Sequence, residues 1–573
     1  MNKVWEQRYN SSASLPDDLT DLAERLEISP FLAGLLWRRG ICGLEKMSLF
    51  LDPGLRYLPP LTGWPVLLDT AAFIGKHILD GKKLVVWGDY DVDGITSSAL
   101  VSDFFRQHGF TVRAHIPDRL GEGYGLNNAD LEMLAAEKTD LVLTVDCGIS
   151  DLAEVKKAKE LGLTMIISDH HLPGPQLPEA DRICAPTVGE CPCPHLAGVG
   201  VAFMLMAGVN QFFASQGLPK IDIRPLLDLV ALGTLADVSN LSGVNRILVK
   251  NGLLVLAEAR RPGLAALKTS CNKAVNAALT AEQVVFNLAP RINAAGRMGQ
   301  SDVALRLLLT QDREEAASCA HKLEVLNTER RSKEDNITQE AREQAQRFVQ
   351  SGSMGLVLYQ PHWHMGIIGI VASRMVDEFK RPTSILCNNR EKIKGSGRSV
   401  EGFDLHAALS ECADLFLGYG GHKMAAGLTI TYENLILFRE RFDQTVRQIF
   451  GNSTAPSKIK IDGELTMAES IDLTLLKELE MLQPFGTGNE IPVFVSPPLY
   501  VREVRKHGQC LFVLDVLDKK SGLSAKAKIW RSKSDQPADS KGHMVRLAYS
   551  PGIDRYNGPD NVELQVKDWV IEE

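Results

Sequence analysis

Between residues 71 and 310, short apolar runs alternate with segments whose apolar residues recur at helical spacing. The apolar runs predict β-strands at 83–87, 111–116, 141–145 and 164–167. The segments between them predict helices at 97–107, 129–137 and 151–161. Strands joined by such helices predict βαβ units and a parallel sheet covered on both faces. Because ligands bind beyond the carboxyl ends of parallel strands, the polar residues after each strand are the candidate functional residues.

The rest of the chain has three further patterns. Residues 1–70 contain short helical patterns and end in a proline-rich stretch, which predicts a small helical lead-in with no readable function. Residues 301–350 carry one apolar stripe among charges and no glycine or proline, which predicts a long helix or a helix pair. From about residue 456, short alternating segments separated by turn signals predict a small β-barrel.

The composition sets the class of protein. A chain of 573 residues exceeds one hydrophobic core and predicts about three to five domains. With 45% hydrophobic and 23% charged residues, it has the composition of an ordinary globular protein. The formal charge of −8 gives no overall basic signature, so nucleic-acid binding would need local basic surface and metal ions.

The ten cysteines are scattered, and the first residues have neither the basic nor the apolar region of a signal peptide. We therefore expect reduced thiols and a cytoplasmic protein. The segment Cys191-Pro-Cys193-Pro-His195 resembles half of a zinc site, but no second pair follows at standard spacing. The longest uncharged apolar run, residues 196–209, is shorter than the ~20 residues that span a membrane and predicts a buried helix.

Three aspartates follow the first predicted strand, at every second position: Asp89, Asp91 and Asp93. In an extended chain they would share one face about 6.5 Å apart, and their mutual repulsion would favour a bound cation. The same spacing opens a calcium-binding EF-hand loop, but the twelfth position is Leu100 instead of glutamate and a strand precedes the loop. A solvated acidic turn is the other alternative for this stretch alone.

Further acids and two imidazoles follow later apolar runs. Asp146 follows the third strand, Asp169, His170 and His171 follow the fourth, and Asp237 follows the apolar segment 226–235. Taken singly, each acid is more often a helix cap than a ligand. Because the ends of parallel strands meet at one sheet edge, these groups together could bind two divalent ions bridged by an aspartate.

These residues carry a family resemblance. GDYDVDG, VDCG, SDHH and GTLADV, in that order, resemble the four motifs of the DHH phosphoesterase superfamily. Further segments make nearly the whole chain similar to the RecJ family of bacterial single-strand-specific exonucleases. They are IPDRLGEGYGLN at 116–127, LAGVGVAF at 196–203, RINAAGRMG at 291–299, GIIGIVASR at 366–374, GGHKMAAG at 420–427 and PFGTGN at 484–489.

The resemblance implies an α/β fold in which a parallel-sheet DHH domain and a smaller α/β DHH-associated domain are joined by a long helix. It also implies a C-terminal β-barrel with the OB-fold, which binds nucleic acid. The expected boundaries are 1–70 for the lead-in, 71–310 for the DHH domain, 311–350 for the helix, 351–455 for the DHH-associated domain and 456–573 for the OB-fold.

The resemblance implies two divalent ions, Mn²⁺ or Mg²⁺, and a catalytic set. The expected ligands are Asp89, Asp91, Asp93, Asp146, His170 and Asp237. Asp146 would bridge the two ions, Asp89 could instead orient the other ligands, and His171 would contact the scissile phosphate. The ions would generate hydroxide and stabilise developing charge, so no covalent protein nucleophile is needed.

The family pattern also implies DNA-binding residues. Arg119, Ser373 and Arg374 resemble a 5′-phosphate site, and Tyr124 is expected to stack on a base or to wedge against it. The expected backbone-positioning residues are Arg291, Asn293 and Arg297, for which a capped turn is the structural alternative; His422 is expected to bind phosphate.

The implied activity is 5′→3′ hydrolysis of single-stranded DNA to 5′-mononucleotides in DNA repair and recombination. The implied partners are single-stranded-DNA-binding protein and a RecQ-type helicase, with the chain itself a monomer. Two alternatives remain open: a DHH-type phosphodiesterase of short oligoribonucleotides or cyclic dinucleotides, and a non-catalytic DNA-binding accessory subunit. The C-terminal barrel opposes the first, and the intact acidic set opposes the second.

Overall fold

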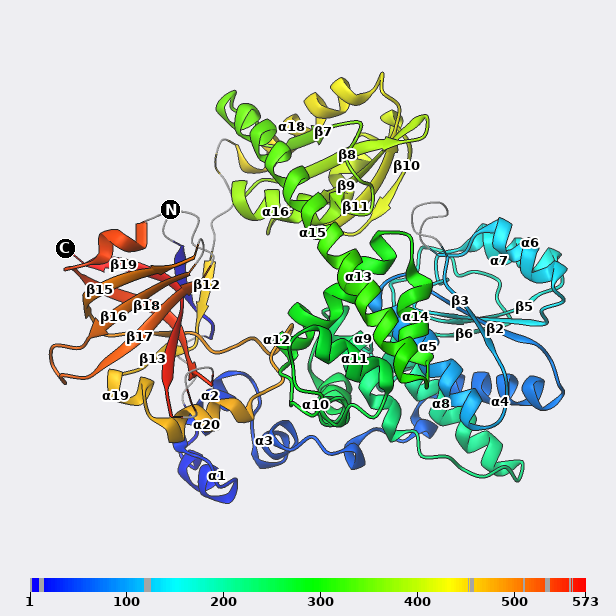
Figure 1. Cartoon of the computed structure of the whole chain (residues 1–573), viewed down its shortest axis with the longest axis horizontal. Helices are drawn as coiled ribbons and strands as arrows, with labels where there is room; N and C mark the ends of the chain where they lie inside the picture. The colour runs from blue at the N-terminus through cyan, green and yellow to red at the C-terminus, as the bar shows by residue number, and fades with distance from the viewer. Residues whose placement is uncertain are drawn as a thin grey trace. The chain divides into compact units, whose positions relative to one another are not determined.

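A computed structural model describes residues 3–9, 15–117, 125–451, 453, 458–508, 511–530, 536–555, 558 and 560–572. The chain forms two compact units that do not follow chain order (Figure 1). One unit combines Met1–Tyr57 with Pro456–Glu573, and the other is the continuous segment Leu58–Ala455.

The first half of the continuous unit is built on a five-stranded parallel sheet in the order β3-β2-β4-β5-β6. The strands are β2 (Leu84–Gly88), β3 (Arg113–His115), β4 (Leu141–Val145), β5 (Thr164–Ser168) and β6 (Arg182–Cys184). Every residue of β2 and β4 is buried, as the uninterrupted apolar runs require of strands covered on both faces. The predicted parallel sheet is confirmed.

Helices cover both faces of this sheet (Figure 1). They are α4 (Pro65–Leu79), α5 (Val92–Gln107) and α8 (Gly198–Ser215) on one face, and α6 (Asn128–Ala136) and α7 (Leu152–Glu160) on the other. Among the described residues, α8 is the one helix long and apolar enough to cross a membrane, yet 72% of its apolar window is buried inside the protein. It packs against α4, α5 and the helix at Leu227–Ala236, as expected of a core helix.

A helical layer follows the sheet. Its elements are α9 (Leu227–Ala236), α10 (Gly243–Glu258), α11 (Pro262–Ser270), α12 (Ala281–Gln283), η4 (Val284–Leu288), α13 (Ala289–Arg297) and α14 (Ser301–Leu309). The apolar segment 226–235, to which the sequence pattern assigns no element, lies mostly in helix α9, which packs against α5, α8 and α10. A segment apolar on all sides is buried all round, and such a run does not distinguish a strand from a core helix.

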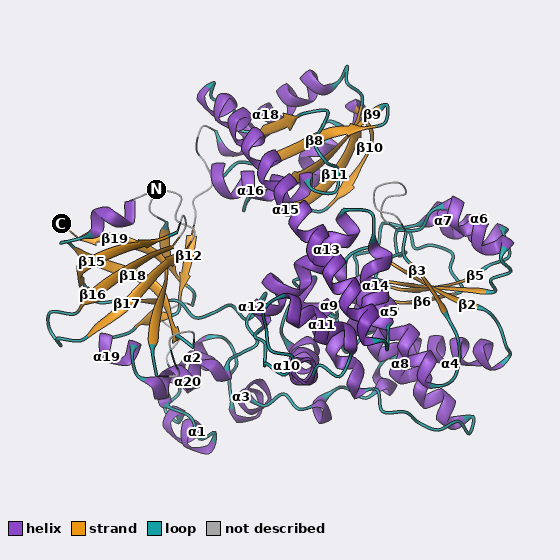
Figure 2. Cartoon of the chain, viewed as in Figure 1, coloured by secondary structure: helices purple, strands orange, loops and turns teal. Residues whose placement is uncertain are grey.

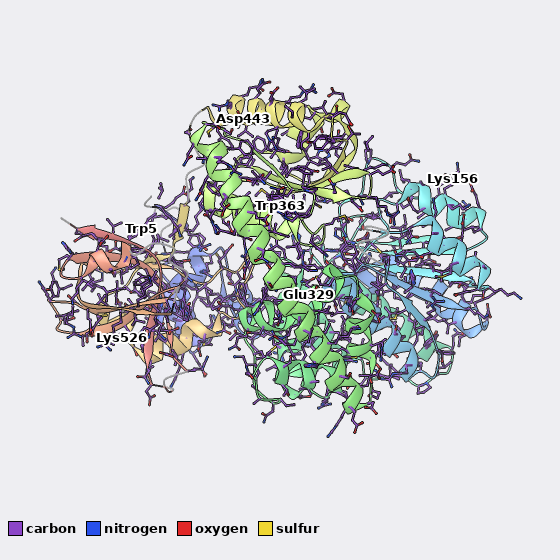
Figure 3. The ribbon with its side chains drawn as sticks, turned by 45° about the horizontal axis from the view of Figure 1, so that its top comes forward. Trp5, Lys156, Glu329, Trp363, Asp443 and Lys526 are labelled. Carbon is purple, nitrogen blue, oxygen red and sulfur yellow. The ribbon has the colours of Figure 1, made fainter. Side chains whose placement is uncertain are left out.

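The connection to the second half is the 38-residue helix α15 (Arg313–Gln350), on which Glu329 is labelled in Figure 3. It begins at Asp312, whose carboxylate accepts the backbone N–H groups of Glu314 and Glu315. Residues 301–350 thus form a helix pair, α14 and α15, as predicted.

The second half has a mixed five-stranded sheet in the order β10-β11-β9-β8-β7, in which only β7 and β8 are parallel. Its strands are β7 (Leu356–Tyr359), β8 (Thr383–Asn389), β9 (Lys392–Arg398), β10 (Phe416–Gly421) and β11 (Ala425–Ile430). Its helices are α16 (Ile368–Phe379), α17 (Leu405–Ser410), η5 (Ala413–Leu415) and α18 (Leu435–Phe450). In α18, the carboxylate of Asp443 accepts the Gly355 N–H at 2.9 Å, which fixes the entry to β7 (Figure 3).

The other unit contains a closed barrel (Figure 2). Its strands are β15 (Leu499–His507), β16 (Leu511–Leu517), β17 (Ser524–Trp530), β18 (Met544–Ile553) and β19 (Val562–Glu572). The order β18-β15-β16-β17-β19 closes because β19 also pairs with β18. The expected OB-type barrel is confirmed. Flanking it are β12 (Lys458–Ile461), β13 (Gly463–Glu464), α19 (Met467–Ser470), α20 (Leu473–Met481), β14 (Phe494–Val495) and η6 (Gln536–Ser540).

The N-terminal segment belongs to this same unit. It contains β1 (Val4–Gln7), α1 (Leu19–Arg25), α2 (Pro30–Arg38) and α3 (Leu44–Leu51), and the short turns η1 (Leu55–Tyr57) and η2 (Leu61–Gly63) follow. Strand β1 pairs in parallel with β12, and Trp5 donates its indole N–H to Asp568 at 2.8 Å (Figure 3). Leu32 and Leu36 of α2 share one buried core with Leu476 and Phe494. The two ends of the chain are therefore one folding unit.

Candidate metal centre

The first three aspartates lie where β2 ends and α5 begins. Asp91 is the N-cap of α5 and accepts the Gly94 N–H at 3.1 Å, so Asp93 lies in the first helical turn. The prediction that the three acids share one extended face is wrong, because the strand ends at Gly88 and the chain turns. Gly94 is required there, since a Cβ would lie 2.4 Å from the backbone oxygen of Asp89.

Asp93 is fixed by the start of α8. Its two carboxylate oxygens accept the N–H groups of Gly198 at 2.7 Å and Val199 at 2.9 Å. A Cβ on Gly198 would lie 2.6 Å from Oδ1 of Asp146, so only glycine fits between the two acids. The segment 196–199 therefore serves the centre through its backbone.

Asp146 follows β4 in a left-handed conformation with φ of 64°. Its N–H donates to the carbonyl of Ser168 at 3.0 Å, which keeps the turn attached to the neighbouring strand β5. Aspartate is one of the few residues that tolerate this backbone region. The conformation lets an acid directly after a buried strand lie beside Gly198 and His170.

Asp169 organises the next motif, SDHH. Its carboxylate accepts the N–H of Ile149 at 3.0 Å and of His170 at 2.7 Å, and it binds Nδ1 of His171 at 2.7 Å. The Nε2 atom of His170 then lies 3.1 Å from Oδ1 of Asp146 and 3.8 Å from Oδ2 of Asp93. Asp169 is thus the residue that orients both histidines.

Asp237 enters the centre from the C-terminal end of helix α9, where it is the C-cap, and not from the end of a strand. The hydroxyl of Ser239 donates to its Oδ2. The next residue, Val238, has φ of 61°, a strained value for a β-branched side chain. The tight turn allows Ser239 to reach back to Asp237.

The donor atoms form three overlapping groups, each with its atoms within 4.8 Å of one another. Asp89 and Asp91 group with Asp146, and Asp146 also groups with His170 and His171. His170 in turn groups with Asp93 and Asp237. Asp146 and His170 therefore lie between two acidic pairs. Asp89 and Asp91 form one pair, and Asp93 and Asp237 form the other.

The electrostatics of the centre favour bound cations. Burial raises the pKa of Asp93 well above its ordinary value, and the charges of Asp237 and Asp91 raise it further. Burial likewise raises the pKa of Asp146 and Asp237, and it lowers the pKa of His170. Divalent ions would offset this repulsion, and a set of carboxylate and imidazole donors suits Mn²⁺ or Mg²⁺.

His171 differs from His170 in its charge state. Burial alone would lower its pKa, but the hydrogen bond and the charge of Asp169 raise the pKa of His171 to about 9. In turn, the hydrogen bonds from His171 and backbone N–H groups lower the pKa of Asp169, although burial opposes them. His171 is therefore a protonated donor at neutral pH, suited to an anionic oxygen.

The arginines expected to bind DNA in the RINAAGR segment have protein partners. Arg291 is buried, pairs with Glu324 and donates to the carbonyl of Asn287 at 2.6 Å. Arg297 donates to the carbonyl of Gly366 at 3.0 Å, which ties α13 to the segment before α16. Asn293 is half-buried on α13.

The residues expected to bind phosphate in the second half lie on different elements. On α16, Ser373 donates to the carbonyl of Gly369 at 3.3 Å, and Arg374 pairs with Glu334 and Asp335 of α15. A Cβ on Gly369 would lie 3.0 Å from both Arg398 Nη2 and Ser396 Oγ of β9.

His422 is exposed at the turn between β10 and β11, where its N–H donates to the carbonyl of Ala425 at 2.8 Å. Arg119 and Tyr124 lie outside the described residues.

Two residues of the centre were absent from the expected site. Asp169 was visible beside the histidines in SDHH, and its position directly after a strand was the signal. Ser239 had no signal, because its contact with Asp237 depends on the turn at Val238.

Three family models match the chain. They are the DHH family N-terminal domain over residues 83–234, the DHHA1 domain over 352–448 and the RecJ OB domain over 461–568. They match the parallel sheet, the mixed sheet and the barrel respectively.

Relatives cover nearly the whole chain. The single-stranded-DNA-specific exonuclease RecJ of Dickeya dadantii is 34% identical over 99% of both chains. That of Bacillus subtilis is 33% identical over 97% of this chain and 70% of its own. The crystal structure of RecJ from Thermus thermophilus in complex with Mn²⁺ matches 98% of this chain and 79% of its own, with a TM-score of 0.82 and 30% identity.

Proposed function

Because the chain belongs to the RecJ family of single-stranded-DNA-specific exonucleases, we propose that it removes 5′-mononucleotides stepwise from the 5′ end of single-stranded DNA. The observation that carries this proposal is the pair of acidic groups joined by Asp146 and His170. A protein that only bound DNA would have no need for this many buried, mutually repelling carboxylates. We place its work in DNA repair and recombination.

The cofactors are divalent ions, Mn²⁺ or Mg²⁺, the ions named in the solved structures of the Thermus relative. We assign Asp89, Asp91 and Asp146 to one ion, and Asp93, His170 and Asp237 to the other, with Asp146 between them. Bound there, the ions supply a hydroxide nucleophile near neutral pH and stabilise charge on phosphate and leaving oxygen.

The chain's own residues then orient the metal ligands and bind the scissile phosphate. Gly198 and Val199 fix Asp93, Asp169 fixes both histidines, and Ser239 fixes Asp237. We assign His171, protonated through its pair with Asp169, to a non-bridging oxygen of the scissile phosphate.

We propose DNA contacts outside the centre for Arg119, Tyr124, Ser373 and His422, of which His422 is exposed on its hairpin. Arg297 and Asn293 remain proposed backbone contacts on α13. The ion pairs of Arg291 and Arg374 favour a supporting role, in which these arginines hold α13 and α16 against α15. Only direct binding measurements separate these roles.

We also propose the five boundaries expected from the sequence, with the added feature that the segment before residue 58 folds with the OB unit. We propose a monomer that works in the cytoplasm on DNA, together with single-stranded-DNA-binding protein and a RecQ-type helicase.

The test uses purified protein, Mn²⁺ and strands labelled at either end, as single strands and duplexes of DNA and as RNA. We expect rapid release of a labelled mononucleotide from the 5′ end of single-stranded DNA only. Asp91→Asn should abolish release while leaving DNA binding, and Asp222→Asn, in an exposed ion pair with Arg224, is the matched control that keeps it. Release that starts at the 3′ end, or an active Asp91→Asn protein, contradicts the proposal.

A further inference from the structure

Two cysteines lie in the loop between β6 and α8, one residue apart. The N–H of Cys193 donates to Sγ of Cys191 at 3.3 Å, and the two thiol side chains also interact. Cys191 is half-buried and Cys193 is buried. Within the described residues, all potential three-ligand metal groups lie in the acidic centre, and none includes these cysteines. The resemblance to half of a zinc site therefore has no metal geometry behind it.

The two thiols are chemically unequal. The hydrogen bond from the Cys193 thiol lowers the pKa of Cys191 below the ordinary thiol value, although partial burial opposes this effect. The same bond raises the pKa of Cys193. A thiolate is the reactive form of cysteine, so the more accessible sulfur is also the better nucleophile, with a neutral thiol directly beside it.

The loop that carries them is continuous with the backbone that holds Asp93. The Leu196 N–H donates to the carbonyl of Cys193 at 3.4 Å, and two residues later Gly198 and Val199 bind Asp93. Only four residues, 194–197, therefore separate the cysteine pair from the backbone that holds Asp93.

The loop has a second attachment to the centre. The side-chain amide of Asn245, buried on α10, donates to the carbonyl of His195 at 2.5 Å and to that of Asn240 at 2.9 Å. Asn240 belongs to the turn that follows Asp237. The cysteine loop is thus attached both to the backbone donors of Asp93 and to the turn that follows Asp237.

We propose that Cys191 and Cys193 form a peroxide-oxidisable dithiol, and that closing their disulfide displaces the backbone donors of Asp93 and slows the nuclease. This inference has two halves. The activity half, which is the slower nuclease after oxidation, rests on the proposed function, whereas the thiol half, which is the formation of the disulfide, does not. The oxidant is a hydroperoxide such as hydrogen peroxide.

The chemistry balances in two steps. The Cys191 thiolate attacks one peroxide oxygen, the O–O bond breaks, and Cys191 becomes a sulfenic acid as hydroxide leaves and takes up a proton. The Cys193 sulfur then attacks Sγ of Cys191 and expels water with its own proton. Overall, two thiols and one hydrogen peroxide give one disulfide and two waters, and a dithiol reductant reverses the change.

Cys184 is the competing partner. It is buried at the end of β6, and it is close enough for the charge of Cys191 to raise its pKa. Its backbone carbonyl accepts the N–H of Asp169 at 3.3 Å, so a bond from Cys184 would disturb the histidines instead. Peptide mapping distinguishes the two pairings.

The thiol half is tested on the full chain treated with hydrogen peroxide, then alkylated, digested and analysed by mass spectrometry. We expect the peptide with Cys191 and Cys193 to lose two hydrogens and to resist alkylation until reduced. A Cys184→Ser protein should behave identically. Two free thiols in that peptide after treatment, or a bond from Cys191 to Cys184, overturns the assignment.

The activity half is measured on the same samples. Oxidised wild-type protein should degrade single-stranded DNA about tenfold more slowly, the usual cost of disturbing groups that orient a metal ligand, and a dithiol should restore the rate. Cys193→Ser combined with Cys184→Ser should keep its rate after treatment, because the sulfenic acid at Cys191 then has neither of the two nearby thiols as a partner. An oxidised wild type at full rate overturns the coupling to Asp93.

Failure of the proposed function has a different signature. A reduced wild-type protein without exonuclease activity contradicts that function, and the peptide result still decides the disulfide. In that case, Mn²⁺ affinity of reduced and oxidised protein, measured by calorimetry, replaces the rate. Equal affinities would refute the coupling.

Discussion

Helices α5 and α9 pack side by side and carry buried aspartates at both ends of their contact. The two ends differ in how the negative charge of these aspartates is compensated. At one end, Asp103 and Asp228 bind Arg261 at 3.0 and 3.2 Å, and all three side chains are almost fully buried. At the other end, the ion pairs of the described residues give Asp93 and Asp237 no arginine partner, and burial and neighbouring aspartates raise the pKa of both. One end is neutralised by the protein itself, and the other is left for ions from solution.

The comparison separates stability from function. A buried carboxylate is tolerable when a cation of the chain compensates it, and costly when none does. The ion pairs of Arg261 therefore contribute to the stability of the fold. The uncompensated carboxylates around Asp93 lower the stability of the metal-free protein and provide a binding site for cations. The following predictions test that division.

The largest effect is expected from Asp93→Asn. Removing one charged ligand should lower the exonuclease rate by about a thousandfold or more, which corresponds to several kcal/mol of lost charge stabilisation. In chelator, the variant should be at least as stable as the wild type, because a repelling buried charge is gone. Single-turnover digestion and thermal unfolding in EDTA measure the two quantities; a destabilised variant would show that Asp93 also supports the fold.

At the opposite end, Arg261→Met should destabilise the protein by about 3–5 kcal/mol, since the buried carboxylate of Asp228 loses its arginine and that of Asp103 keeps only the half-exposed Arg106. Urea unfolding measures the loss. Adding Asp103→Asn and Asp228→Asn to Arg261→Met should recover much of the stability, and the rate per folded molecule should stay near that of the wild type. A stable single variant would contradict the assigned role of the pair.

Metal removal gives a third measurement. At a Mn²⁺ concentration about 100-fold above its dissociation constant, the wild type should gain about 2.7 kcal/mol over the protein in chelator. Asp93→Asn should gain clearly less, and Arg261→Met should gain as much as the wild type. Equal gains in all three proteins would place the stabilising ions elsewhere.

Asp151 is an intermediate case, a largely buried carboxylate that has no arginine partner and belongs to no candidate metal group within the described part of the chain. Burial raises its pKa to about 6, although it accepts the Leu126 N–H at 2.7 Å. Because the folded pKa lies above the unfolded value, the folded state binds the proton more tightly. Lowering the pH through 6 towards 4 should therefore add stability, by at most about 3 kcal/mol. Urea unfolding of wild type and Asp151→Asn at several pH values should show this contribution only in the wild type.

The smallest effect is expected from Ser239→Ala. Loss of the hydroxyl that orients Asp237 should lower the rate by about tenfold and weaken Mn²⁺ binding, with little change in stability. Ser239→Thr should retain most of the rate, because the donor is kept. If both variants match the wild type, the turn at Val238 alone positions Asp237.

The sequence predicted the parallel sheet and its acids because each buried strand is an unbroken apolar run followed by a polar residue. It misplaced the start of α5, since the N-cap bond of Asp91 is local geometry that alternation does not reveal. It assigned no element to the apolar segment 226–235, most of which forms α9, because a core helix apolar on all sides has no periodicity.

Other features depended on contacts distant in sequence. The partners of Arg291 and Arg374 lie on α15, 33 and about 40 residues away, so a basic residue in a motif could not be distinguished from a structural ion pair. The role of Gly198 is a backbone hydrogen bond to Asp93, which leaves no compositional trace.

The pairing of both chain ends in one unit has a consequence for synthesis. The apolar face of α2 emerges from the ribosome about 400 residues before its partners, which at ~5–20 residues per second means a delay of roughly 20–80 seconds. During that time the continuous unit can fold while the first segment stays exposed to chaperones and proteases. A chain released early lacks the strands that cover α2. The apolar face of α2 then stays exposed, and chaperones and proteases can recognise the incomplete chain by it.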